Sequence, residues 1–211
     1  MARLFVTTVL LFSILFSNAQ DIFEGYENLF STPRNYIVYR AFSEIIIDGK
    51  ADEISWQKAK WSDFFKDIEG DKKPAPTYHT RIKMLWDEQN LYILAELEEP
   101  NVWAYYLTRD QIVFHENDFE IFIDPDHDTH NYFEFEINAQ NTLFDLFMPK
   151  PYRNGGKYDI GWNANNFKSA VFVDGTINNP TDTDKKWTVE MAIPYSDLKT
   201  EGDFIVPKNG D

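Results

Sequence analysis

The sequence predicts an all-β protein, specifically an antiparallel β-sandwich of jelly-roll or immunoglobulin-like architecture. Short segments of strand-like composition recur along the chain, and several alternate apolar with polar residues at a period of two. Clusters of Gly, Pro, Asn and Asp separate these segments at short intervals, which is typical of sandwiches. The pattern leaves room for little more than one short helix, so both observations favour two packed sheets.

The expected elements follow in chain order. Residues 51–59 carry the pattern of a short helix, with Trp56 as a packing residue. Residues 87–90 form a turn between two strands and predict a hairpin. The expected strands are 36–39, 44–47, 80–86, 91–98, 117–124, 132–138, 142–148, 168–173 and 187–194.

The most regular alternation lies between residues 114 and 147. In both strands expected there, apolar residues occupy one face and acidic or polar residues the other. We expect the apolar face in the core and the acidic face, with Glu120, Glu134 and Glu136, on the outside. The predicted core residues are Phe119, Ile121, Phe133, Phe135, Val189 and Met191.

The N-terminus has the pattern of a secretory signal peptide. A basic residue, Arg3, precedes an apolar run over 4–16, and a small residue, Ala19, stands at the expected cleavage point. The alternative, a membrane anchor, is disfavoured because the run is shorter than the roughly 20 residues that span a bilayer. We therefore expect a signal peptide at 1–19, a leader at 20–35 and one domain at 36–211. The mature protein should be secreted, periplasmic or cell-surface, without membrane association.

Composition narrows the partners of this domain. The formal net charge is −15, which argues against binding to nucleic acid or to an anionic membrane. The chain has no cysteine, so it has no disulfide framework. Aromatic residues make up 17% of the sequence, more than one core of this size needs, so some rings should lie at the surface. Neutral or cationic ligands fit this composition better than anionic ones.

Several motifs resemble those of the family 9 carbohydrate-binding module, especially of its extracytoplasmic relatives in polysaccharide-degrading bacteria. The resemblance runs from about residue 45 to the C-terminus, and the strand with its following proline, 117–125, is its most specific part. The residues that carry it are Ile46, Asp48, Gly49, Trp56, 84–87, Leu91, Tyr92, Glu99, Pro100, 117–125, 187–190, Ile193 and Pro194. It implies a sugar-binding β-sandwich, often attached to a glycoside hydrolase, with structural calcium.

The resemblance also implies roles for particular residues. The family's aromatic platform falls on Phe114, and its sugar-contacting acid falls on Glu120. A family arginine on the next strand has no clear match, because Glu136 stands near that position. The family's second aromatic clamp lies in C-terminal strands, and the sequence ends at Asp211 before such a segment. We therefore expect the domain at 36–211 to lack its last strands.

The residues themselves are consistent with sugar binding. Pyranose rings stack on aromatic side chains, and their hydroxyl groups need convergent carboxylates and amides. Each ring has core packing as its alternative, and the acidic row has a plain solvated sheet face as its alternative. The candidate substrate-binding residues are Phe114, Trp103, Glu120, Glu134, Glu136 and Asp145, with Tyr105, Tyr106 and Asn138 as further candidates.

An acidic turn follows the strand at 117–124. Asp124, Asp126 and Asp128 alternate as in the first half of an EF-hand loop, whose oxygen ligands bind calcium. It is not an EF-hand, because Thr129 replaces the required glycine and Phe135 replaces the required glutamate. A looser calcium site and a plain acidic turn both remain open.

Three classes of function remain. The first is a non-catalytic carbohydrate-binding module that recognises neutral glycans, beside or attached to a glycoside hydrolase. The second is a glycoside hydrolase that uses paired carboxylates such as Glu120 and Glu136. The third is a purely structural or interaction sandwich. The sequence contains no nucleophile elbow, phosphate-binding loop or dinucleotide fingerprint, which leaves the binding module as the preferred hypothesis.

Overall fold

The computed structural model describes residues 25, 34–199, 206–208 and 210. The chain divides into two units, Met1–Asn35 and Tyr36–Asp211, and nearly all described residues belong to the second. The expected signal peptide at 1–19 lies outside the described residues. Within the described part of the chain, every helix is too short or too polar to cross a membrane.

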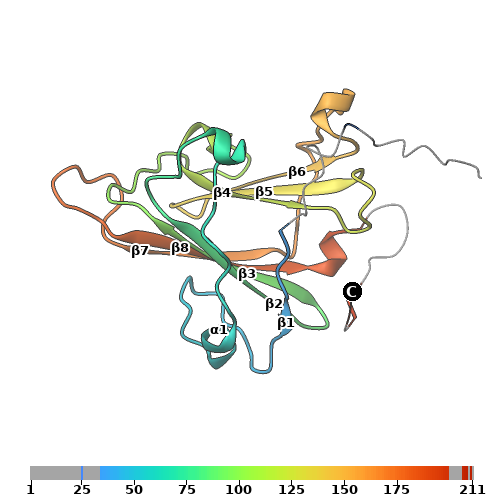
Figure 1. Cartoon of the computed structure of the whole chain (residues 1–211), viewed down its shortest axis with the longest axis horizontal. Helices are drawn as coiled ribbons and strands as arrows, with labels where there is room; N and C mark the ends of the chain where they lie inside the picture. The colour runs from blue at the N-terminus through green and yellow to red at the C-terminus, as the bar shows by residue number, and fades with distance from the viewer. Residues whose placement is uncertain (1–24, 26–33, 200–205, 209, 211) are drawn as a thin grey trace, which may run out of the picture. The chain divides into compact units, whose positions relative to one another are not determined.

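The second unit consists of two β-sheets, which confirms the predicted all-β sandwich (Figure 1). The five-stranded sheet has the order β1 (Tyr39–Arg40), β2 (Thr80–Trp86), β3 (Asn90–Glu98), β8 (Lys186–Pro194) and β7 (Lys168–Asp174). The three-stranded sheet consists of β4 (Asp118–Ile123), β5 (Tyr132–Asn138) and β6 (Leu143–Met148). Neighbouring strands are antiparallel except β1 and β2, which are parallel.

Helical structure is limited to short pieces. The α-helix α1 spans Ile54–Lys58, within the range predicted for the short helix. The 3-10 helices are η2 (Gly70–Lys72), η3 (Val113–His115), η4 (Tyr152–Asn154) and η5 (Tyr195–Asp197). The 3-10 helix η3 lies in the connection from β3 to β4, and this connection shapes the site described below.

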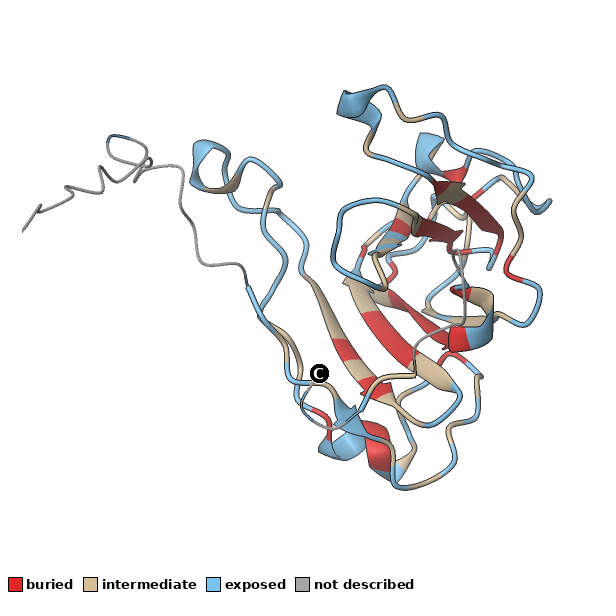
Figure 2. Cartoon of the chain, turned by 90° about the vertical axis from the view of Figure 1, so that its right-hand side faces the viewer, coloured by how far each residue is buried: buried red, intermediate tan, exposed pale blue. Residues whose placement is uncertain are grey.

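The core lies between the two sheets, and Figure 2 shows buried residues gathered on the strands of both. Alternate residues of β8, including Trp187 and Val189, pack in one cluster with alternate residues of β5. Burying a large apolar side chain contributes roughly 1.5–3 kcal/mol, so this interface is the main source of stability. Of the predicted core residues, Phe119, Phe133, Phe135, Val189 and Met191 are buried, and Ile121 packs half-buried against them.

A second apolar cluster covers the outer face of the five-stranded sheet. Trp56 of α1 packs there with residues of β2, β3 and β8, including Leu94, which confirms its predicted packing role. The fully buried Glu190 of β8 accepts hydrogen bonds from Trp56 Nε1 (2.7 Å), Asp48 N (2.9 Å) and Gly49 N (3.0 Å). Gly49 has φ +85°, and a Cβ there would lie 2.8 Å from Phe172 N, so only glycine fits this turn.

Two strand predictions near the N-terminus of this unit require correction. The strand expected at 36–39 is present only as β1, Tyr39–Arg40. The strand expected at 44–47 is absent, because side chains near α1 take the backbone donors that a strand would use. Ile46 N donates to Glu53 Oε1, and the preceding Ser43 N donates to Ser55 Oγ. Hydrogen bonds from these backbone N–H groups to nearby side chains therefore replace the backbone hydrogen bonds of a strand pair.

Candidate functional site on the outer face of the three-stranded sheet

Acidic side chains gather on the face of the three-stranded sheet that points away from the core. The register places Glu120 of β4 opposite Glu136 of β5, and Phe122 opposite Glu134. Asp118 begins β4 on the same face, since residues two apart along a strand point to the same side. Asp118, Glu120 and Glu136 each offer an oxygen atom within 4.8 Å of the others. This group is called the sheet cluster below.

The acids of β5 are not solvated, so a plain solvated face is the wrong description of this row. Glu134 is 5% exposed and Glu136 is 1% exposed, whereas Glu120 is exposed. The cover comes from the connection between β3 and β4: Val113 packs against the outward apolar side chains of β6. Tyr152 OH also donates to Glu134 Oε2 (3.3 Å). Among these three acids, Glu120 on β4 is therefore the exposed one.

Several hydrogen bonds fix this connection over the sheet. Asn138 Nδ2 donates to Tyr106 O (2.9 Å) and to Glu116 Oε1 (2.6 Å). Thr142 Oγ1 donates to Tyr106 O (2.7 Å). The Glu116 carboxylate in turn accepts from Tyr105 N (2.7 Å) and Tyr106 N (3.3 Å), so the connection is held at both ends of the covered region.

The sheet cluster has an unusual electrostatic environment. Within the described part of the chain, no Lys, Arg or His forms a salt bridge with Asp118, Glu120 or Glu136. Two buried oxygens, Glu136 Oε2 and Asp118 Oδ2, have no hydrogen-bond partner. Burial, with added repulsion from neighbouring acids, raises the pKa of Asp118 to about 7 and that of Glu136 well above its usual range.

Phe114 supplies an exposed aromatic ring beside this cluster. It belongs to η3 and is 50% exposed. Its ring packs edge-on against Phe144, with centroids 6.4 Å apart, and Phe144 lies opposite Glu136 in the sheet register. Trp103 is half-buried and stacks on the exposed Tyr105 at 6.0 Å. Phe114 therefore lies over the outer face of the same sheet, linked to Glu136 through Phe144.

Asp145 does not share this face. It lies opposite Phe135 of β5, whose side chain is in the core, and it is fully buried. Arg109 Nη2 donates to both of its carboxylate oxygens at 2.7 Å, and Ala164 N donates to Oδ2 at 2.7 Å. The predicted role of Asp145 in substrate binding stays a prediction, and these contacts favour a role in holding the Arg109 loop to β6.

The predicted metal residues Asp124, Asp126 and Asp128 also come together, each with an oxygen within 4.8 Å of the others. Asp124 accepts hydrogen bonds from His127 N (3.1 Å) and Thr129 N (2.8 Å), as an acidic residue does in a plain turn. Carboxylate oxygens can accept such bonds and still bind a cation. Both acidic clusters could therefore hold a metal ion, and neither geometry excludes the plain alternative.

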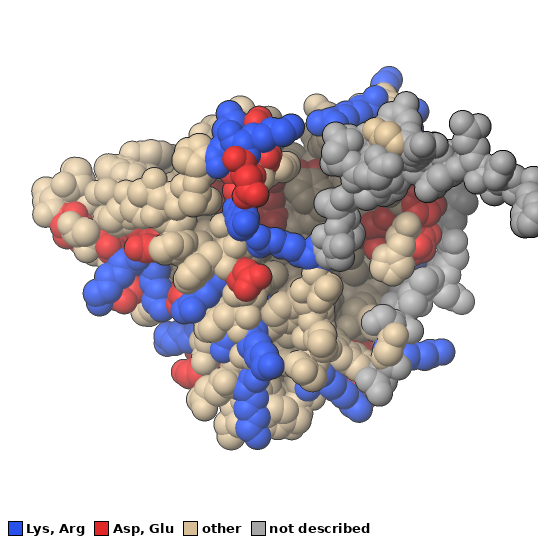
Figure 3. Space-filling view, in the orientation of Figure 1, with Lys and Arg blue, Asp and Glu red and all other residues tan. Residues whose placement is uncertain are grey.

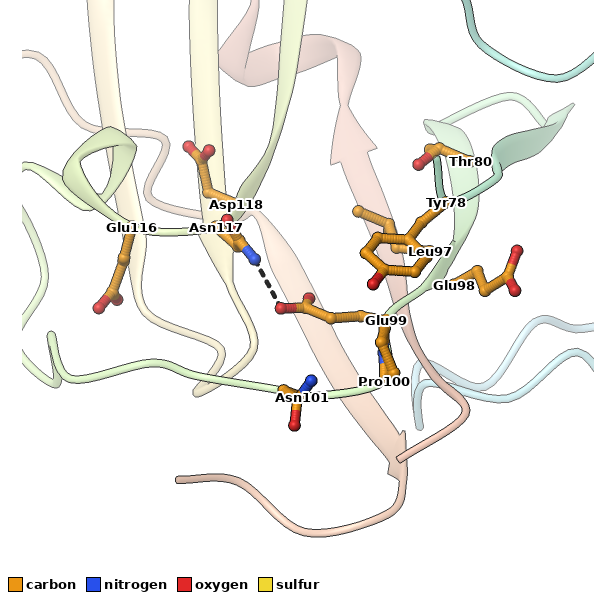
Figure 4. A pocket seen from close by; sticks show the side chains of 10 residues that line it. All are labelled: Tyr78, Thr80, Leu97, Glu98, Glu99, Pro100, Asn101, Glu116, Asn117 and Asp118. Carbon is orange, nitrogen blue, oxygen red and sulfur yellow. Dashed lines mark hydrogen bonds between the residues drawn. The ribbon is translucent and has the colours of Figure 1, made fainter. Parts of the chain in front are cut away.

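A pocket of about 430 Å³ opens near the start of β4 (Figure 4). The buried Glu99 lies at its wall and accepts from Asn117 Nδ2 (2.5 Å) and Trp187 Nε1 (2.9 Å). In Figure 4, Asn117 turns toward Glu99 while Asp118 points away from it. Sequence reasoning did not single out Asp118, although the alternation already placed it on the face of Glu120.

The fold and this face together define a class, a two-sheet β-sandwich with an acidic outer face, and a solved structure shares the fold. A crystal structure of a Bacteroides uniformis protein to which carbohydrate binding is ascribed has the same fold. The two share a TM-score of 0.56 and 15% identity over 79% of this chain and 76% of that one. A family 9 module of Caldicellulosiruptor kristjanssonii in complex with cellotriose gives a TM-score of 0.49, with 20% identity over 82% and 71%.

The family is identified by a match between most of the sequence and a family model. Residues 47–206 match the family described as carbohydrate family 9 binding domain-like, and the chain belongs to it. Exoglucanase XynX of Acetivibrio thermocellus is 26% identical over 87% of this chain. Endo-1,4-beta-xylanase A of Thermoanaerobacterium saccharolyticum is 28% identical over 78%. The matched regions are 14% and 11% of those relatives, so the chain corresponds to one segment of each.

Proposed function

We propose that this domain binds neutral glycans without cleaving them, at the open edge of the acidic face on the three-stranded sheet. The observation that carries the proposal is the match of residues 47–206 to the family 9 carbohydrate-binding domains. The exposed ring of Phe114 beside the sheet cluster supports this location.

The proposed roles follow from the chemistry of sugars. Phe114 stacks on the apolar face of a pyranose ring, and Glu120, exposed on β4, accepts hydrogen bonds from sugar hydroxyls. Glu134 and Glu136 are buried in this structure, and their predicted role in substrate binding stays a prediction. One stacking ring contributes about 1 kcal/mol beyond its buried area, so we expect weak binding.

The charge distribution supports an uncharged ligand. The net charge is −15, which disfavours acidic polysaccharides through repulsion. Figure 3 shows lysine and arginine side chains along the lower rim of one face, with acidic side chains between them. The face in view therefore has no uniform positive patch for an anionic ligand.

We also propose that the protein is exported and works beside, or as part of, a glycoside hydrolase. The apolar run after Arg3 supports export, and the similarity to segments of a xylanase and an exoglucanase supports the association. Expression with the native N-terminus in a bacterial host tests export. Mass spectrometry of the extracytoplasmic protein should give a mature N-terminus at Gln20, whereas a chain retained in the cytoplasm with Met1 would contradict it.

Binding is tested by affinity electrophoresis and titration calorimetry with xylan, cello-oligosaccharides and a panel of other neutral glycans. We expect the exported form to bind at least one of them, and Phe114→Ala to weaken that binding about tenfold, or about 1.4 kcal/mol. Phe42→Ala is the matched control, since Phe42 is a similarly exposed phenylalanine outside the sheet cluster. Failure to bind any glycan would favour a purely structural sandwich.

Glycoside hydrolysis is the second candidate, because Glu120 and Glu136 face each other across two strands and burial raises the pKa of Glu136, as a general acid requires. Release of reducing sugar by the wild type and its loss in Glu120→Gln would support the enzyme. Binding without such release supports the binding module.

Calcium at Asp124, Asp126 and Asp128 belongs to the same proposal as a structural cofactor. The support is their convergence after β4 and the preference of calcium for oxygen ligands. Such an ion would fix the turn between β4 and β5, next to the open edge of the glycan face.

A further inference from the structure

We propose that Asp118, Glu120 and Glu136 form a binding site for a divalent cation of the calcium type on the outer face of the three-stranded sheet. This site is separate from the acidic turn at 124–128. It does not depend on the glycan proposal, because cation binding is measured with no sugar present.

The first observation is geometric. The three side chains come from the neighbouring strands β4 and β5, and each places an oxygen within 4.8 Å of the others. Calcium binds oxygen ligands at 2.3–2.6 Å, so three oxygens spaced evenly around one ion are about 4.0–4.5 Å apart. This spacing lies within the 4.8 Å limit that the three carboxylates meet, so they can share one such ion.

The second observation is an unsatisfied buried group. The Glu136 side chain is 99% removed from solvent, and its Oε2 atom has no hydrogen-bond partner. Asp118 Oδ2 is likewise buried without a partner. Leaving a buried carboxyl oxygen unpaired is costly, so native proteins rarely do so without a ligand, ion or water at that position.

Other buried acids in the described part of the chain accept hydrogen bonds from nearby donors. Glu190 accepts from three N–H donors, and Asp145 is bound by Arg109 and Ala164 N. Asp184 accepts from Val102 N (2.7 Å) and Thr176 N (2.7 Å). These acids hold loops to strands, whereas the sheet cluster has acids facing acids. A cation is the missing partner that would satisfy all three at once.

The charges around the sheet cluster also support a cation site. In the region that the structure describes, no basic side chain forms an ion pair with the cluster, and Glu134 adds a further nearby acid. The cluster therefore carries either bound protons or a bound cation. These two states differ in a measurable way, because only the second makes stability depend on the concentration of calcium.

The test uses the exported form of the chain after chelator treatment. Calcium chloride should produce a binding isotherm in calorimetry and raise the melting temperature. Glu136→Gln should weaken calcium binding at least tenfold, and Glu120→Gln, at the exposed edge, should also weaken it. Glu120→Gln keeps the test valid if Glu136→Gln fails to fold.

Two controls separate this site from its neighbours. The double variant Asp126→Asn, Asp128→Asn should keep the calcium response of the sheet cluster, and Phe114→Ala should keep it while losing glycan affinity. The proposal is overturned if the wild type shows no calcium response. It is also overturned if both cluster variants respond like the wild type, or if the double variant at the turn abolishes the response entirely.

Discussion

Glu190 and Glu136 occupy comparable places in the two sheets. Each lies on an interior strand, points away from the sandwich core and is at most 1% exposed. Their partners differ: Glu190 accepts from Trp56, Asp48 and Gly49, while Glu136 is surrounded by other acids and has an unpartnered oxygen. Equal burial therefore goes with different surroundings: Glu190 holds Trp56, Asp48 and Gly49 to β8, whereas Glu136 has the unpaired oxygen on which the proposed cation site rests.

The largest effect is expected at Glu190. Glu190→Ala removes the acceptor for three buried N–H groups, and unsatisfied buried donors are costly, so we expect a loss of about 3 kcal/mol or more. Urea unfolding followed by tryptophan fluorescence measures it. Glu98→Ala is the control: Glu98 is exposed on β3 and its carboxylate pairs with His79, so the loss should stay below about 1 kcal/mol. A similar loss of unfolding free energy in both variants would contradict the structural role of Glu190.

Substitution of Glu136 should change stability in the opposite direction. Burial raises the pKa of Glu136 to about 9, so at pH 8 this carboxyl must hold a proton to stay buried, which costs stability. In the presence of a chelator, Glu136→Gln puts an always neutral side chain there, so the protein should become more stable by about 1 kcal/mol or more at pH 8. The same urea unfolding measures it. Destabilisation by several kcal/mol would place Glu136 with Glu190 as a structural residue.

The pH dependence sharpens this difference. The pKa values of Asp118 and Glu136 are raised in the folded state, to about 7 for Asp118, so their protonated forms favour folding. Their contribution is fully present below about pH 4. It is lost as pH rises to about 7 for Asp118 and to about 9 for Glu136. Without calcium, the free energy of unfolding of the wild type should fall more steeply over this range than that of Glu136→Gln. Parallel curves would contradict the assignment.

The smallest effect is expected at the acidic turn. Asp126 is exposed, so Asp126→Ala should change the free energy of unfolding in chelator by less than about 0.5 kcal/mol. If the turn binds its own calcium ion, the variant should lose part of the calcium-dependent rise in melting temperature. Thermal unfolding with and without calcium measures both quantities. If calcium raises the melting temperature of the variant as much as that of the wild type, the turn is a plain acidic turn without calcium.

The sequence by itself determined the sandwich, most strands and the two faces of each strand. The hairpin of β2 and β3 and the strand β5 fall where alternation and turn residues placed them. The same alternation identified the core row with Phe133 and Val189. These features are local: side-chain direction in a strand repeats every two residues, and neighbouring residues alone reveal it.

Only the tertiary structure decided which acids are covered and which have partners. Alternation predicts that the acids of β5 face solvent, whereas in the structure Glu134 and Glu136 are buried on that outward face. The donors to Glu190 lie 134 to 142 residues away in the sequence, and Asp145 meets Arg109 across 36 residues. A period of two says which side of a strand a residue faces. What lies on that side depends on the packing of distant segments, and strand periodicity carries no information about it.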